Sequence, residues 1–241
     1  MTPPEKYVWL IWASAFLIPW LALRLCYRRL GRLMTFASVL TMPFGLTEPI
    51  FVPRYWNPPS LFDLARRTGF DIESLIFCFG LGGVGVVLYV ALTRQTLEPL
   101  APIDRHAQRH RYHRVALLTP VIVFPALYLL GWNPIYPAIL AMLSGGAATI
   151  ACRPDLARNT FAGGALFACY YALFMLLLDW SAPGYIHRVW NVADLSGAIF
   201  IGIPIEELLF GFAFGLYWSG IYEHLAWRRL VPVVAGPVYH A

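Results

Sequence analysis

The sequence predicts an all-α, polytopic integral membrane protein with seven transmembrane helices arranged as a parallel 3+1+3 repeat. Hydrophobic residues make up 59% of the 241 residues and charged residues only 13%, about half the charged share of a soluble globular protein. The apolar runs are roughly 20 residues long, which is the length of a helix that crosses a bilayer. They are about twice as long as the strands of a membrane β-barrel. Composition therefore excludes a disordered chain and disfavours a soluble enzyme.

Seven apolar segments are expected to span the membrane. The weakest is the fourth, because it is short and contains Pro120 and Pro125. Proline is tolerated in a bilayer helix where neighbouring groups satisfy the carbonyls that it frees. The seven segments are Tyr7–Cys26, Leu33–Val52, Asp71–Thr93, Val115–Gly131, Ile135–Cys152, Thr160–Trp180 and Pro204–Trp227.

The distribution of basic residues predicts the orientation. Of the 18 basic residues, 13 lie at or beyond the ends of the first, third, fifth and seventh segments, and five lie on the other side. Cytoplasmic loops carry the excess of Lys and Arg. We therefore expect an inner or cell membrane protein with its N-terminus outside and its C-terminus in the cytoplasm. The net charge of +5 is assigned to these loops, and no nucleic-acid partner is expected.

The chain contains an internal duplication. An R-x-W-N element starts at Arg54 and again at Arg188, an offset of 134, and an I-E-x-L-x-F-x-F element follows at Ile72 and at Ile205, an offset of 133. Shared apolar composition, the alternative explanation, does not readily preserve two such elements in the same order. The copies occupy predicted helices 2–3 and 6–7, a displacement of four helices, so both cross in the same direction. The expected organisation is a first repeat over residues 1–93, a basic cytoplasmic loop and linker helix over 94–134, and a second repeat with a short cytoplasmic tail over 135–241.

Carboxyl groups in the predicted spans are the candidates for chemistry. Glu206 and Glu207 begin the last helix after Pro204, and their equivalents in the first copy are Glu73 and Ser74. The structural interpretation is that acids are favoured at a helix N-terminus. The functional one is favoured for Glu206, because an Asp at the centre of a bilayer helix costs about 2.5–3.5 kcal/mol on insertion scales. Burial favours the neutral acid, which can then give a proton to a substrate.

Aromatic side chains lie close to these acids. Phe77 and Phe210 each follow a glutamate by four residues, on the same helix face. Because ring faces attract cations, they suit a site that holds a carbocation; packing against lipid or helices is the alternative. Two asparagines follow the motif tryptophans, and ordering of the outer loops is the favoured role for them. The substrate-binding candidates are Trp56, Trp190, Phe77, Phe210, Asn57 and Asn191.

Other motifs predict no metal and no cofactor. The G-x-G-x-x-G run over residues 80–85 lies inside a predicted helix without a βαβ unit, so close helix packing explains it better than a nucleotide site. His106, His110 and His113 belong to an arginine-rich loop, for which lipid headgroups are favoured over a metal. The four cysteines are scattered, without the spacing of a disulfide framework or zinc site. No D-D-x-x-D pair supports a magnesium-dependent prenyl transferase. Since Lys6 is the only lysine, a retinal protein is excluded.

The P-x-E-E element of Pro204, Glu206 and Glu207, in a small duplicated polytopic chain, resembles the membrane-integral lycopene cyclases in their fused two-half form. The resemblance implies an enzyme without flavin or other cofactor that closes the ψ-end of lycopene, or of a related linear isoprenoid, into a β-ionone ring. The reaction is redox-neutral, of the intramolecular lyase or isomerase type. Glu206 or Glu207 would protonate the terminal double bond, and Glu73 would remove a ring proton. The first half departs from the motif, with Asp71 in place of the proline, and whether it is active stays open.

Two other classes of function remain as alternatives. One is a non-catalytic carotenoid- or isoprenoid-binding membrane protein. The other is a small-solute transporter with parallel repeats, although the polar groups cluster at helix ends rather than at mid-depth. The expected partners are the lipid bilayer and a hydrophobic carotenoid or isoprenoid; a homo-oligomer, the exact substrate and the ring type stay open. We also expect Glu73 and Glu206 to face one shared, mainly aromatic cavity.

Overall fold

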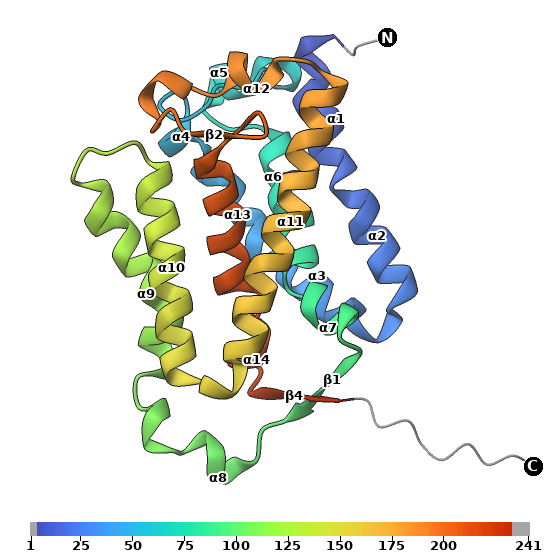
Figure 1. Cartoon of the computed structure of the whole chain (residues 1–241), viewed down its shortest axis with the longest axis vertical. Coiled ribbons are helices and arrows are strands. Elements are labelled where there is room, and N and C mark those ends of the chain that lie inside the picture. The colour runs from blue at the N-terminus through green and yellow to red at the C-terminus, as the bar shows by residue number, and fades with distance from the viewer. Residues whose placement is uncertain (1–3, 233–241) are drawn as a thin grey trace, which may run out of the picture.

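The computed structural model describes residues 4–232, so the predicted cytoplasmic tail beyond residue 232 lies outside the described residues. The chain is mostly helical, and its longer helices run along the length of the molecule (Figure 1). Helix α1 and the short helices α4, α5 and α12 lie at one end, and α8, β1 and β4 at the other (Figure 1). The first half comprises α1 (Glu5–Ala15), α2 (Leu17–Cys26), α3 (Gly31–Thr41), α4 (Glu48–Phe51), α5 (Leu64–Thr68), α6 (Ile72–Gly85), α7 (Leu88–Leu92), β1 (Gln95–Pro99) and α8 (Pro102–Arg105).

The rest of the chain begins with α9, the predicted linker helix. Its elements are α9 (His113–Tyr128), α10 (Ile135–Cys152), α11 (Ala157–Ser181), α12 (Tyr185–Val189), β2 (Ile199–Phe200), β3 (Ile203–Pro204), α13 (Ile205–Trp218), α14 (Ile221–Leu225) and β4 (Arg228–Pro232). Helix α9 runs through Pro120 and Pro125 without interruption. Helix α10 has the same bounds as the fifth segment predicted from the sequence.

Three helical segments within residues 4–232 are long and apolar enough to cross a membrane. They are Glu5–Cys26, Ile135–Cys152 and Pro154–Ser181, and α6 is a shorter apolar helix. The chain is therefore a membrane protein, as its composition predicts. The full set of seven spans stays a prediction.

The second predicted span is interrupted. Residues 33–52 comprise most of α3, a 3-10 turn over Met42–Thr47, the short helix α4 and Val52. Pro43 and Pro49 fall in this stretch, and proline supplies no backbone N–H for a helical hydrogen bond. Gly45 brings the turn so close to α6 that an added Cβ would lie 2.7 Å from the backbone nitrogen of Leu75. The break in the helix lets the chain pack closely against α6.

Three consecutive elements recur along the chain. Helices α6 and α7 and strand β1 have counterparts in α13, α14 and β4, and every bound is displaced by 133 residues. Positive φ angles recur at the same offset, at Gly69 and Gly202 and at Arg94 and Trp227. Packing partners also correspond, since α6 packs mainly against α3 and α13 mainly against α11. Local backbone geometry thus repeats at the offset of the sequence match.

Small residues sit where these helices cross. A Cβ on Gly82 would lie 1.7 Å from Thr41 Oγ1, and one on its counterpart Gly215 would lie 2.8 Å from the carbonyl oxygen of Gly163. Only glycine permits so close an approach of two helices. The glycine run in α6 thus serves helix packing, as its position in the sequence indicates.

The duplicated R-x-W-N motifs meet at the end of the molecule that holds α1. Their tryptophans face each other in an antiparallel β-bridge. The Asn57 N–H donates to the Val189 carbonyl at 2.8 Å, and the Asn191 N–H donates to the Tyr55 carbonyl at 2.9 Å. Asn191 is the counterpart of Asn57 and Val189 that of Tyr55 at the offset of 134, so the pairing is reciprocal between the copies.

A second reciprocal pairing closes the opposite end. Strands β1 and β4 are antiparallel, and their register places Leu97 opposite Leu230. These two leucines are equivalent at the offset of 133. Each end of the bundle is therefore held by a segment paired with its own counterpart from the other half.

Candidate functional site

Glu206 lies at the start of α13, almost fully buried. Its Oε1 accepts hydrogen bonds from the Tyr136 hydroxyl and from the backbone N–H of Ser196, both at 2.8 Å. Its Oε2 is buried and has no hydrogen-bond partner among residues 4–232. The two donors on Oε1 stabilise the carboxylate form of Glu206, and Oε2 is the oxygen that would carry the proton in the acid form.

Glu207 is equally buried but differently bonded. Its Oε2 accepts from the Tyr171 hydroxyl at 2.7 Å, and its Oε1 accepts from the Trp190 indole N–H at 2.5 Å. Both oxygens act as acceptors, which is the bonding pattern of an ionised carboxylate. Two adjacent glutamates are thereby held in different environments.

Glu73 repeats the pattern of Glu206 in the first half. It is fully buried in α6, and its Oε1 accepts from the backbone N–H of Leu61 at 2.6 Å. Its Oε2 has no partner within the described residues. In both halves the N–H donor lies between the bridged tryptophan and the helix that holds the glutamate. Leu61 lies between Trp56 and α6, and Ser196 lies between Trp190 and α13. Glu73 and Glu206 make no hydrogen bond to each other within residues 4–232, and the shared cavity stays a prediction.

Glu48 is a candidate that the motif analysis missed. Its side chain is buried at the start of α4, and its Oε2 accepts from the Ser74 hydroxyl at 3.1 Å. Ser74 is the counterpart of Glu207, so Glu48 brings a carboxyl to the place where the second half has Glu207. The signal was present in the sequence, since Glu48 is a charged residue inside a predicted span.

Asp71 stands where the P-x-E-E element has its proline, and its role in the structure accounts for that difference. It is the N-cap of α6, and its side chain accepts from the backbone N–H of Ser74. A capping aspartate satisfies one of the free N–H groups of the first turn. The second half begins its helix with Pro204 and has no side-chain cap. The two helices thus start by different local means at equivalent positions.

The predicted aromatic residues gather around Glu207. The rings of Trp56 and Trp190 lie 5.3 Å apart between centroids. Phe77 and Phe210 both lie near Tyr171, at 6.4 and 5.7 Å. Trp190 and Tyr171 donate to the two oxygens of Glu207. This carboxyl therefore connects the tryptophan pair to the aromatic rings around Tyr171, and both sets contain residues of both halves.

The two motif asparagines lie in loops at the end of the bundle that holds α1 (Figure 1). The Asn191 side chain donates to the Arg54 carbonyl and to the Asp194 carboxylate. Asn57 is exposed, and its backbone takes part in the bridge between the motifs. These contacts agree with a role in ordering the loops.

Comparison with known families connects this geometry to a class of enzyme. Residues 133–225 match the model of the family described as lycopene cyclase, a range that takes in α10, α11, α13 and α14. The matched range contains Glu206, Glu207 and their partners Tyr136 and Tyr171. Searches of curated proteins and of solved structures gave no match. The family supports a carotenoid cyclase role in general terms. The resemblance predicted from the P-x-E-E element is thus confirmed over residues 133–225, and this membrane protein is similar to the lycopene cyclases in the half that holds both glutamates of that element.

Proposed function

We propose that the protein closes the ψ-end of lycopene, or of a related linear isoprenoid, into a β-ionone ring by redox-neutral acid/base chemistry. The observation that carries this proposal is the contrast between two adjacent buried carboxyls. Glu206 keeps one oxygen without a partner among the described residues, whereas Glu207 accepts on both oxygens. One is suited to give a proton and the other to receive one.

The reaction begins with proton transfer from Glu206. The proton on Oε2 adds to the terminal double bond of the ψ-end and leaves a tertiary carbocation. Glu206 then becomes a carboxylate, and the Tyr136 hydroxyl and the Ser196 N–H already bonded to its Oε1 stabilise the new charge. Donors placed in advance where charge develops lower the barrier.

Ring closure follows when the neighbouring double bond attacks the cation and forms a carbon–carbon bond. The rings of Tyr171, Phe210 and Trp190 lie around Glu207 and suit a cationic intermediate. The Glu207 carboxylate then removes a ring proton, which leaves the ring double bond. One proton enters and one leaves, so the product is an isomer of the substrate. Glu73 is the alternative base, by its equivalence to Glu206.

The repeated geometry supports a two-copy architecture. The reciprocal pairings of Trp56 with Trp190 and of Leu97 with Leu230 lie at opposite ends of the bundle. A pseudo-two-fold axis through both pairings would run along the bundle, as expected for parallel repeats related about the membrane normal. We therefore propose the 3+1+3 arrangement, and the 13-to-5 distribution of basic residues supports an N-terminus outside.

Expression in a lycopene-accumulating host tests the proposed function. We expect chromatography of the extracted pigments to show β-ring carotenoids with the wild-type protein. The double variant Glu73→Gln/Glu206→Gln, present in the membrane in equal amount, should leave lycopene unchanged. If the wild-type protein co-purifies with lycopene but forms no ring, it is a carotenoid-binding protein and the enzymatic proposal is wrong.

A further inference from the structure

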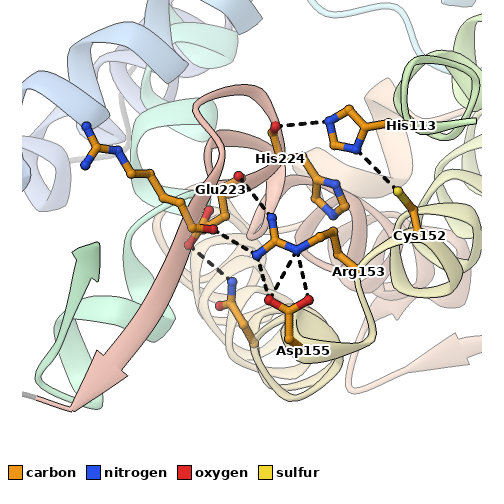
Figure 2. A network of polar contacts seen from close by, with 8 residues as sticks. His113, Cys152, Arg153, Asp155, Glu223 and His224 are labelled. Atoms are coloured by element: carbon orange, nitrogen blue, oxygen red, sulfur yellow. Dashed lines mark hydrogen bonds and ion pairs between the residues drawn. The ribbon is translucent and has the colours of Figure 1, made fainter. Parts of the chain in front are cut away.

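A second polar cluster lies at the other end of the bundle and has no part in the proposed reaction. It joins His113 at the start of α9, Cys152 at the end of α10 and His224 in α14 (Figure 2). One potential ligand atom from each residue lies within 4.8 Å of the others. All three side chains are buried, with exposed fractions of 7%, 5% and 1%. Three segments that are distant in sequence thus place two imidazoles and a thiol together.

The hydrogen bonding of His113 orients its ring for coordination. Its Nε2 lies 3.1 Å from the carbonyl oxygen of His224, and its Nδ1 lies 3.3 Å from Cys152 Sγ (Figure 2). A carbonyl can only accept, so the proton sits on Nε2 and the Nδ1 lone pair faces the sulfur. Histidine ligands commonly donate their other ring nitrogen to a carbonyl in this way.

His224 provides an independent sign that the cluster lacks a partner. Its Nδ1 is buried and has no hydrogen-bond partner among the described residues. The His224 ring stacks against the His113 ring, with 5.3 Å between centroids. The Trp227 ring also stacks on His113, with 4.1 Å between centroids. A buried polar atom without a partner is costly, and a bound cation would remove that cost.

Arg153, the buried charged residue next to the cluster, has hydrogen-bond partners of its own. Arg153 follows Cys152 and is fully buried, but its guanidinium is bound by Asp155 at 2.8 and 2.6 Å and by the Arg228 carbonyl at 2.9 Å. Figure 2 shows the guanidinium turned toward Asp155 and away from the His113–Cys152 contact.

We propose that His113, Cys152 and His224 bind one zinc ion, which ties together the ends of α9, α10 and α14. Nitrogen and sulfur ligands suit zinc, whereas calcium and magnesium require oxygen. With bonds of about 2.3 Å to sulfur and 2.0–2.1 Å to nitrogen at tetrahedral angles, the two ligand atoms would be about 3.5 Å apart. This value is close to the 3.3 Å between His113 Nδ1 and Cys152 Sγ. The thiol loses its proton to solvent on binding, and water takes the fourth position.

Metal analysis of the purified protein tests the site. The protein is isolated in detergent with an affinity tag that contains no histidine, stripped with a chelator and titrated with zinc. We expect about one zinc per chain. Cobalt in place of zinc should give thiolate-to-metal charge-transfer absorption. Cys152→Ser should abolish that absorption and weaken zinc binding by at least about tenfold, the lower end for loss of even an outer-shell partner.

Matched variants separate this site from other thiols and imidazoles. Cys26→Ser removes an exposed cysteine and His187→Gln an exposed histidine of the outer loops, and both should bind zinc as the wild-type protein does. Equal zinc binding by wild type and Cys152→Ser would overturn the proposal. If Cys152→Ser fails to fold, the wild-type cobalt spectrum decides, because a spectrum without thiolate absorption also overturns it. Pigment conversion in the same host is measured separately, so failure of the proposed function leaves this test intact.

Discussion

The two halves of the molecule hold buried carboxyls in similar places by different means. In the second half, both acids come from consecutive residues of one helix, Glu206 and Glu207. In the first half, α6 supplies Glu73, and the second carboxyl comes from Glu48 on a separate short segment. The difference teaches that the second carboxyl can come either from the same helix or from a separate segment packed against it. A motif search that reads a single helix does not detect the second arrangement.

The largest expected effect distinguishes the two principal acids. We expect Glu206→Gln to lower ring formation at least ~10²-fold, the low end for a positioned general acid, because the amide keeps the shape without the proton. Glu73→Gln should cost less, since only the second half keeps the complete motif. Pigment chromatography at equal protein level measures both. Equal losses would mean that the halves contribute alike, and an unchanged product from Glu206→Gln would remove it from the mechanism.

A smaller effect tests whether Glu48 substitutes for the missing acid. In the Glu206→Gln background, Glu48→Gln should reduce the residual product by up to about tenfold, below the range of a direct acid. Adding Ser74→Glu should restore part of it, because it returns a carboxyl to the position equivalent to Glu207. Glu98→Gln is the matched control, since Glu98 is exposed and lies in β1. No loss from Glu48→Gln would restrict that carboxyl to a structural role.

The helix contacts of the two halves can be compared by substituting the equivalent glycines Gly82 and Gly215 and measuring the stability of the folded protein. Gly215→Ala and Gly82→Ala should each destabilise the folded protein by about 1–3 kcal/mol, the range for overpacking. We expect Gly215→Ala to cost more, because its Cβ meets the Gly163 backbone whereas that of Gly82 meets a threonine side chain. Thermal unfolding in detergent measures the difference. Gly220→Ala, with ordinary contacts of 3.6 Å or more, should change stability by no more than about 0.5 kcal/mol.

The smallest effects concern the two motif arginines. Arg188 pairs with Glu5 at 3.1 Å with both side chains about half exposed, so Arg188→Ala should cost at most about 1 kcal/mol. Arg54 instead donates to the carbonyls of Gly131 and Trp132. High salt should shrink the effect of Arg188→Ala and leave that of Arg54→Ala nearly unchanged, because salt screens pairs of exposed charges. Equal sensitivity to salt would contradict this assignment.

The sequence predicts the long helices well and the broken ones poorly. A continuous apolar run defines α10 to the residue. The run over residues 33–52 is equally apolar, but prolines and a close approach to α6 divide it, and that approach is a tertiary contact. Likewise the P-x-E-E element points directly to Glu206 and Glu207 as candidates, and both side chains are buried in the structure. Glu48 requires knowledge of which segment packs against Ser74.

The cluster around Cys152 could not be predicted from a local sequence pattern, because it too depends on tertiary contacts. Its three members are separated by 39 and 72 residues along the chain, so no zinc spacing appears. Spacing rules describe sites built from one turn or loop. Here the bundle itself brings the ligands together.

The pairing of β1 with β4 has a consequence for the order in which the molecule forms during synthesis. Leu97 meets Leu230 only after 133 further residues have been made, on the order of ten seconds at typical translation rates. Through that interval β1 presents an open strand edge, which invites pairing with other chains. Glu98 and Pro99 lie in that strand, and a charge and a proline are the residues that discourage such pairing. The sequence of β1 therefore disfavours pairing with other chains until β4 has been made.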